Sequence, residues 1–237
     1  MSNNTKGSGK ERKTDILRVL GRLFAYMLIL GAILFISAGR LDWVMGWLYM
    51  AMYTCMTVIA LLVVPLDPEL VEERTQIKEG VKEWDKRLTV VGSVLYPLAI
   101  LVVAGLDARF GWSPQIPIAL QLAALIFAVL GELISIWATS VNKFYGRFVR
   151  IQKERGHAVA TGGPYQFVRH PSYVGTILSE LATPIMLGSW WALIPGALDA
   201  ILFVVRTALE DRTLQAELDG YKDYTACVHY RLLPGVW

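Results

Sequence analysis

Six long runs of apolar residues constrain the fold of this 237-residue chain more than any other feature. They are Leu23 to Ala38, Trp43 to Val64, Leu88 to Leu106, Ile116 to Ala138, Tyr173 to Leu187 and Trp191 to Val205. A helix needs about 17–25 such residues to cross roughly 30 Å of hydrocarbon. Hydrophobic residues make up 54% of the chain and charged residues only 18%. We therefore predict an all-α, polytopic integral membrane protein of about six transmembrane helices, of which the last two form a C-terminal helical hairpin.

Two prolines leave the number of spans open. Pro97 interrupts the third run and Pro184 the fifth, so five spans are the alternative to six. A proline does not exclude a membrane helix, because neighbouring helices satisfy the carbonyl group that it frees.

The distribution of Lys and Arg predicts the orientation of the chain. The N-terminal segment and the loops 67–87, 142–169 and 211–237 carry many basic residues, whereas 40–42, 107–112 and 189–190 carry few. Cytoplasmic loops are enriched in Lys and Arg, so we expect both termini in the cytoplasm. The membrane would be the plasma or inner membrane of a bacterium, or the endoplasmic reticulum of a eukaryote.

Composition also divides the chain into regions. Residues 1–15 are rich in Ser, Asn, Gly and Lys and predict a disordered tail. Residues 16–141 hold the N-terminal transmembrane helices, and residues 142–237 hold the segments able to carry chemistry. The loop 67–87 predicts an interfacial helix with Trp84 at headgroup level. The alternative is that Trp84 and Asp85 help to close a site.

Metal, redox and nucleic-acid functions have no support in the composition. The two cysteines and three histidines show no spacing typical of a metal site or a disulfide framework. The net charge of +3 is small and arises mainly at helix ends, so we expect neither a metal nor a nucleic-acid partner.

The polar segment from Asn142 to Tyr173 is the first candidate for a site, on the cytoplasmic face. Gly162 and Gly163 allow the backbone to approach a ligand closely. Pro171 suits the first turn of the following helix, whose unpaired N–H groups can bind an anion beside His170 and Ser172. The alternative is that Arg169 and His170 only anchor the chain at the interface.

A second candidate lies near the end of the last apolar run. Asp199, Phe203, Arg206 and Glu210 follow one another at helical spacing and share one face. Ionisable groups at this depth are costly unless they are paired or face a cavity. An Arg206–Glu210 ion pair within the helix is the alternative. For Asp199, and for Glu132 and Glu180, hydrogen bonding between helices is at least as plausible as a function. The aromatic tail 220–237 either covers the site as a lid or packs on the membrane face.

At two sets of residues the sequence resembles the isoprenylcysteine carboxyl methyltransferase family, which is related to the membrane phospholipid methyltransferases. The first set is His157-Ala158-Val159-Ala160-Thr161-Gly162-Gly163-Pro164-Tyr165, leading into Arg169-His170-Pro171-Ser172-Tyr173-Val174-Gly175. The second is Arg206, Glu210, Asp211, Leu214, Gly220, Tyr221, Tyr224 and Pro234. The resemblance spans about residues 142–234. The family often has two glutamates where this chain has Glu210-Asp211, and the loop between Gln152 and His157 looks shorter than in the animal enzymes.

The resemblance implies a methyltransferase whose cofactor is S-adenosylmethionine, bound in a cytoplasmic pocket. The residues that would surround the cofactor are Gln152, His157, Ala158, Val159, Ala160, Tyr165, His170, Pro171, Ser172 and Tyr173. Glu210 would contact the cofactor from the opposite wall, and Arg206 would face the methyl acceptor. Arg206 and Glu210 are thus the expected catalytic residues.

The chemistry of the acceptor decides what else the site must supply. A carboxylate acceptor needs no general base, and Arg206 would fix it by a bidentate contact while the pocket excludes water. An amine or thiol acceptor must lose a proton, for which Glu210 or His170 would be the base. The apolar spans indicate a lipophilic acceptor that enters from the bilayer, such as a prenylcysteine or a membrane lipid.

Two other classes of protein remain as alternatives. A sterol-reductase-like membrane enzyme would bind NADPH, and such enzymes have similar C-terminal helices. No GxGxxG motif is present, but these reductases do not use a Rossmann domain. A transporter or scaffold with a structural polar end is the non-enzymatic alternative, although we find no internal repeat.

Overall fold

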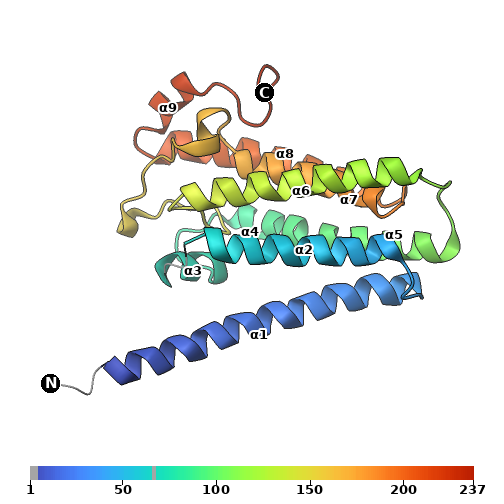
Figure 1. Cartoon of the computed structure of the whole chain (residues 1–237). Helices are drawn as coiled ribbons and strands as arrows, with labels where there is room; N and C mark the ends of the chain where they lie inside the picture. Colours follow the sequence, from blue (N-terminus) through green and yellow to red (C-terminus); the bar gives the residue numbers. More distant parts are fainter. Residues whose placement is uncertain (1–4, 66–67) are drawn as a thin grey trace.

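The computed structural model describes residues 5–65 and 68–237, and the described residues form helices without any strand, which confirms the all-α prediction. The long helices run roughly side by side as a bundle (Figure 1). Their bounds are α1 Thr5–Ala38, α2 Val44–Val63, α4 Glu83–Val90, α5 Tyr96–Phe110, α6 Ile118–Val141, α7 Pro171–Met186 and α8 Leu193–Glu217. The shorter elements are α3 Pro68–Thr75, a π-helical turn Val91–Leu95, the 3-10 turns Lys153–Arg155 and Gly163–Gln166, and α9 Tyr221–Cys227.

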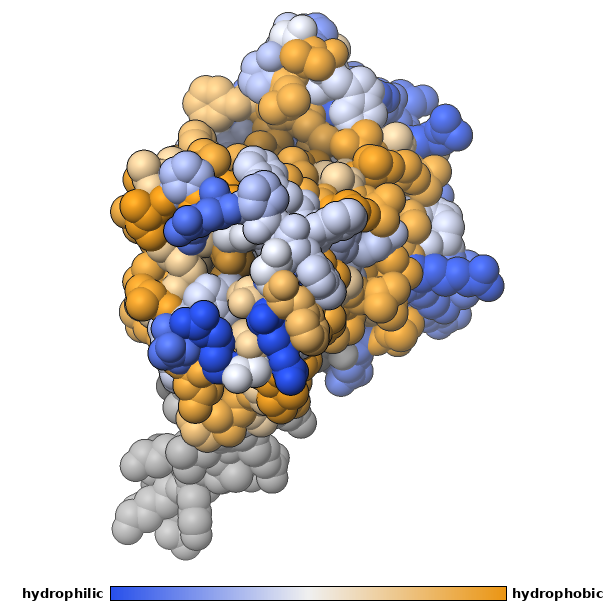
Figure 2. All heavy atoms as spheres, turned by 90° about the vertical axis from the view of Figure 1, so that its right-hand side faces the viewer, coloured by the Kyte–Doolittle hydropathy of each residue, from blue (hydrophilic) through white to orange (hydrophobic). Residues whose placement is uncertain are grey.

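Three helical segments among the described residues are long and apolar enough to cross a bilayer: Val44–Val63, Glu83–Phe110 and Ile118–Val141. Leu23–Ala38, within α1, is a shorter apolar stretch. Large apolar side chains lie exposed along these helices, among them Leu62 of α2 and Ile126 of α6. Figure 2 looks onto one end of the bundle and shows hydrophobic residues covering much of its flanks. Such a surface is suited to lipid rather than to water.

The first helix is longer than the sequence predicts. α1 begins at Thr5, so Thr5 to Asp15 are helical where we expected a disordered tail, and residues 1–4 of that tail lie outside the described residues. Adding turns to an existing helix avoids the cost of nucleation, and the Lys, Arg and Glu residues of this segment favour a helix.

A π-helical turn allows Pro97 to lie within a long helix. α4, the turn Val91–Leu95 and α5 follow one another without a break, and the proline occupies the first turn of α5. A proline clashes with the carbonyl group four residues earlier in a regular helix, and the wider π-helical turn lies at that position. The third apolar run is therefore one continuous helix.

Small residues bring α6, α7 and α8 into close contact. A Cβ atom on Gly131 of α6 would lie 2.5 Å from the carbonyl oxygen of Gly175 in α7, and one on Gly175 would lie 2.4 Å from that of Gly131. Ser135 and Ser179 follow four residues after these glycines and complete a small-residue seam. A Cβ atom on Gly196 of α8 would lie 2.8 Å from the Glu180 carbonyl oxygen. The three helices form one tightly packed unit.

The polar segments gather at one end of the bundle. The beginning of α1, the segment around α3, the loop that follows α6 and the region around α9 all lie at the left-hand end of Figure 1, opposite the α1–α2, α5–α6 and α7–α8 connections. We call this the loop end. It holds both candidate segments that the sequence singles out.

Candidate functional site

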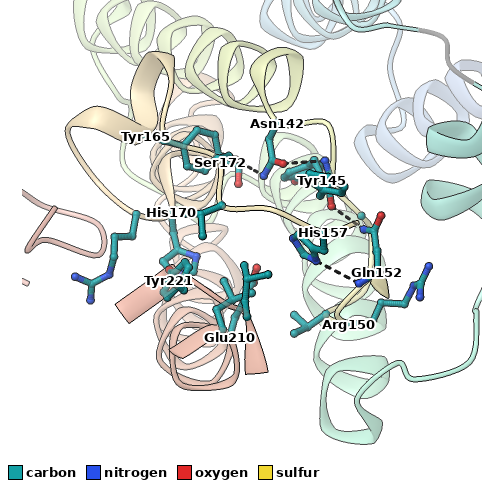
Figure 3. A pocket seen from close by; sticks show the side chains of 18 of the residues that line it. Asn142, Tyr145, Arg150, Gln152, His157, Tyr165, His170, Ser172, Glu210 and Tyr221 are labelled. Atoms are coloured by element: carbon teal, nitrogen blue, oxygen red, sulfur yellow. Dashed lines mark hydrogen bonds between the residues drawn. The ribbon is translucent and has the colours of Figure 1, made fainter. Parts of the chain in front are cut away.

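A cavity of about 760 Å³ opens at the loop end, between the segment that follows α6 and the helices α7, α8 and α9. Figure 3 shows Gln152 and His157 on one wall, facing His170, Glu210 and Tyr221 on the other. Its lining is Asn142, Phe144, Tyr145, Gly146, Phe148, Val149, Arg150, Gln152, His157, Ala158, Val159, Ala160, Tyr165, Arg169, His170, Ser172, Tyr173, Arg206, Glu210, Leu214, Leu218, Tyr221 and Tyr224. We call it the loop-end cavity.

The first wall is a loop that hydrogen bonds hold in shape. Gln152 is buried, its Nε2 donates to the Phe144 carbonyl oxygen at 2.8 Å, and its Oε1 accepts from Arg155 at 2.6 Å. The Gln152 backbone N–H donates to Nδ1 of His157 at 3.2 Å, and the His157 ring stacks on Phe144 at 4.7 Å. Gln152 therefore shapes this wall with polar groups that are already satisfied.

His157 is held as a neutral imidazole. Its burial, followed by the nearby Arg150 and Arg155, lowers its pKa from 6.5 to about 4. Because Nδ1 accepts the hydrogen bond from Gln152, the proton of the neutral ring is on Nε2. The ring thus presents an N–H donor and an apolar face.

The second wall is fixed by Asp211, which is fully buried beneath it. Arg169 donates to both Asp211 oxygens at 2.7 and 3.1 Å, Arg231 donates at 2.8 Å, and the Tyr221 hydroxyl donates at 3.1 Å. Burial alone would raise the pKa of Asp211, but hydrogen bonds from His170, Arg169 and Arg231 hold it well below its usual range. Asp211 remains a carboxylate that joins α7, α8 and the C-terminal tail.

The C-terminal tail packs against this wall. The backbone N–H of Arg169 donates to the Tyr230 carbonyl oxygen at 2.9 Å, and that of His170 donates to the Arg231 carbonyl oxygen at 3.0 Å. The Tyr224 hydroxyl donates to the Tyr165 carbonyl oxygen at 2.6 Å. The tail is thus built into the site rather than resting on the membrane face alone.

Arg206 lies at the inner end of the cavity, where it pairs with Asp85 of α4. Its Nε donates to Asp85 Oδ1 at 2.7 Å, its Nη2 donates to Asp85 Oδ2 at 3.2 Å, and Nη2 also donates to the Arg147 carbonyl oxygen at 2.8 Å. Asp85 also accepts from the Val149 backbone N–H at 2.7 Å. Asp85 therefore already occupies the Nε–Nη2 edge, which is one of the edges from which Arg206 could make the expected bidentate contact to an acceptor.

Glu210 pairs with Tyr173 and not with Arg206, whose ion pair with Glu210 was the alternative to a site role. The hydroxyl of Tyr173 donates to Glu210 Oε2 at 2.5 Å, and the guanidinium of Arg206 lies over the Tyr173 ring at 5.3 Å. No hydrogen bond joins Arg206 to Glu210 among the described residues, so the ion pair within the helix is not formed.

A second cavity, of about 1220 Å³, lies among the helices and shares Tyr145, Tyr173 and Arg206 with the first. We call it the inner cavity. Its lining comes from α1, α2, α3, the π-helical turn, α5, α6, α7 and α8, and includes Tyr49, Arg74, Arg147, Glu132 and Glu180. Three side chains thus line both the loop-end cavity and the larger cavity within the bundle.

The carboxyl groups inside the bundle differ in their hydrogen bonding. Glu132 accepts from Ser179 of α7 at 2.9 Å, which is the kind of contact between helices that we expected. Asp199 is fully buried, and neither of its oxygens has a hydrogen-bond partner among the described residues. The interhelical hydrogen bond that we expected for Asp199 is therefore wrong. Its Oδ1 instead faces Gly92 of the π-helical turn, where an added Cβ atom would lie 3.1 Å away, and a glycine has no side-chain donor to offer.

The structure brings most of the predicted site residues to the loop-end cavity. Pro171 is the exception, because it opens α7 as a buried residue and does not line the cavity. Asn142 and Tyr145 lie within the predicted polar segment, but the sequence does not single either of them out as a site residue. Asp85 was considered only as an alternative, and the 121 positions between it and Arg206 hide their contact from sequence reasoning.

Comparison with known proteins finds similarity to one family of methyltransferases. Residues 119–216 match the isoprenylcysteine carboxyl methyltransferase (ICMT) family. The chain is 34% identical over 71 residues to the protein-S-isoprenylcysteine O-methyltransferase of Schizosaccharomyces pombe, a match that covers 30% of each chain. It is 33% identical over 64 residues to protein-S-isoprenylcysteine O-methyltransferase B of Arabidopsis thaliana, covering 27% of this chain and 32% of that one.

The matched region includes α6, α7 and nearly all of α8, together with both walls of the loop-end cavity except for the residues around α9. The chain matches less than a third of the length of either relative. Over residues 119–216, the chain is therefore similar to the isoprenylcysteine carboxyl methyltransferase family.

Proposed function

We propose that this protein is an integral membrane methyltransferase that transfers a methyl group from S-adenosylmethionine to the carboxylate of a lipophilic, prenylcysteine-like acceptor. The observation that carries the proposal is the pair of cavities that meet at Tyr145, Tyr173 and Arg206. A cofactor and a lipophilic acceptor need two adjoining spaces with a common boundary, at which the methyl group can pass from one to the other.

The residues of the loop-end cavity fit S-adenosylmethionine. Ala158 and Ala160 have small side chains, and neither their backbone groups nor those of Val159 are used in the backbone hydrogen bonds of the described residues. They can therefore serve an adenine ring or another flat polar group. Glu210 offers a carboxylate to hydroxyl or ammonium groups, and Ser172 lies in the first turn of α7, whose positive end favours a carboxylate.

When bound, the cofactor supplies an electrophilic methyl group on a sulfonium sulfur. The protein's part is then to place the acceptor oxygen in line behind that carbon and to exclude water. Tyr173 and Arg206 stand at the boundary of the two cavities and would form the passage for the reacting group. Asp85 occupies one edge of Arg206, which leaves Nη1 of Arg206 to face the acceptor.

Six spans, formed by α1, α2, α4 with α5, α6, α7 and α8, would place the loop end and both termini in the cytoplasm. The acceptor's apolar tail would occupy the inner cavity and reach it from the bilayer, while its head would meet the cofactor from the membrane side.

An amine acceptor, as in phospholipid N-methylation, is the second candidate. Glu132 and Glu180 line the inner cavity and would favour a group that donates hydrogen bonds or carries positive charge. Glu210 or His170 would then take up the proton that an amine must lose.

Calorimetry on the purified protein tests the proposed cofactor. We expect micromolar binding of S-adenosylhomocysteine and no binding of NADPH. Glu210→Gln should weaken that binding, whereas the exposed Asp219→Asn serves as a matched control and should not. Binding of NADPH would instead support a reductase, and binding of neither ligand would support a scaffold.

A further inference from the structure

Arg74 is a half-buried cation that the proposed mechanism leaves unused. It belongs to α3, and its side chain lines the inner cavity. Its Nη2 is buried and has no hydrogen-bond partner among the described residues. Leaving a buried charged donor without a partner is expensive, so such a group indicates a missing anion.

The neighbouring charged groups are already committed to other partners. Glu73, the residue before it, accepts from Arg150 at 2.5 and 2.9 Å and pairs with Lys78 at 3.0 Å. Asp85 is taken by Arg206. These contacts hold α3 against the loop that follows α6 without neutralising Arg74.

Arg74 lines the inner cavity and also contacts a residue that lines both cavities. Its Nε donates to the Tyr145 carbonyl oxygen at 3.4 Å, and its guanidinium lies over the Tyr145 ring at 5.7 Å. Tyr145 is one of the three residues that the two cavities share. The unpartnered donor therefore lies beside the boundary at which methyl transfer is proposed to occur.

Arg74 also lines a groove between α2 and α6, with about 600 Å³ of space. The rest of its lining is mainly apolar or hydroxyl-bearing: Thr57, Ala60, Leu61, Val64, Ser135, Ile136 and Thr139. A ligand that suits both features has an anionic head at Arg74 and an apolar tail along the helices.

The two glutamates of the inner cavity lie deeper in the bundle. Glu132 and Glu180 are about nine residues from the loop ends of α6 and α7, which corresponds to roughly 13 Å along each helix.

We propose that Arg74 binds the carboxylate of the methyl acceptor and sets the enzyme's preference for an anionic head group. This proposal rests on the proposed function and deepens it. Arg206, whose charge Asp85 balances, then shapes the passage, while Arg74 supplies the uncompensated positive charge. The phosphate of a phospholipid is the other source of an anion, and the experiment separates the two.

The test uses the full-length protein in detergent, with Arg74→Gln, Arg74→Lys and the exposed control Arg87→Gln. The acceptors are an N-acetylated S-prenylcysteine and a phosphatidylethanolamine, and the carboxamide of the former serves as an uncharged competitor. Loss of a charge-assisted hydrogen bond should raise the KM for the prenylcysteine about 10- to 100-fold in Arg74→Gln. Binding of S-adenosylhomocysteine and inhibition by the carboxamide should stay unchanged.

Arg74→Lys should recover part of the loss, because it keeps the charge but not the planar fork, and Arg87→Gln should match the wild type. An unchanged KM in Arg74→Gln would overturn the role of Arg74 while leaving the proposed function intact. An effect confined to phosphatidylethanolamine would replace the carboxylate by a phosphate. A wild-type protein that methylates neither acceptor would overturn the proposed function itself.

Discussion

Arg206 and Asp85, 121 positions apart in the sequence, form a two-point ion pair that joins the last long helix to α4 at the inner end of the loop-end cavity. Asp85 is fully buried and Arg206 is 5% exposed. The pair holds α8 against α4 beside the boundary between the two cavities. Its contribution to the stability of the protein and its role in the site can both be tested.

Removing one member of this pair should destabilise the protein. Asp85→Asn leaves the Arg206 guanidinium buried without a carboxylate, which costs about 3–5 kcal/mol in comparable sites. Thermal unfolding in detergent measures the loss, and Asp42→Asn, whose ion pair with Arg40 is exposed, is the matched control. Equal stability of the two variants would show that the buried pair does not hold the helices together.

The Arg206 side chain should matter more for transfer than for cofactor binding. In Arg206→Ala we expect methyl transfer to collapse while S-adenosylhomocysteine still binds with near wild-type affinity, because the loop-end cavity keeps its other walls. Calorimetry and a transfer assay on the same preparation compare the two. Equal loss of cofactor binding would show that Arg206 belongs to the cofactor pocket rather than to the acceptor's side.

The stability of the site should depend on pH through His157. Its pKa in the folded protein, about 4, lies below the ordinary 6.5, so the unfolded chain binds more protons between these values. Stability should therefore rise with pH from 4 to 6.5, level off above this window, and fall on acidification through it. Melting temperatures measured across this range should show a shallower slope for His157→Gln. An identical slope in the variant would assign the pH dependence to other groups.

The contact between α6 and α7 should not tolerate a single added carbon. Gly175→Ala would place a Cβ atom 2.4 Å from the Gly131 carbonyl oxygen, and overpacking of this kind costs about 1–3 kcal/mol. Gly21→Ala is the control, because nothing lies within 4 Å of its added Cβ atom and alanine favours a helix. The melting temperature should fall only for the α7 variant; a comparable fall in both would remove the special role of the seam.

Hydropathy predicted the helical architecture well, because a chain in lipid must satisfy its backbone hydrogen bonds within each segment. The same reasoning located the polar loop after α6 and the end of α8. It treated Pro97 as an interruption, since the π-helical turn that accommodates this proline has no clear sequence signal. It also assigned Thr5 to Asp15 to a tail, since composition says little about how far an adjoining helix extends.

The site was predictable only where its residues are close in sequence. His157 to Tyr173 form a continuous segment, and the spacing of Arg206 and Glu210 places both on one helix face. Spacing within one helix, however, left an ion pair between these two residues as the alternative to a site role, whereas tertiary packing gives Asp85 to Arg206 and Tyr173 to Glu210. Arg74 carries no motif, and only the arrangement of helices shows that its Nη2 has no hydrogen-bond partner among the described residues.

The most direct test of the proposed function is a transfer assay with S-adenosylmethionine labelled in its methyl group. The acceptors are a panel of prenylcysteine analogues and membrane lipids. We predict label in the lipid-soluble prenylcysteine product, released as methanol by mild base because the new bond is a methyl ester. Label that withstands base in an amine-containing lipid, or no transfer at all from a protein that also fails to bind S-adenosylhomocysteine, would contradict it.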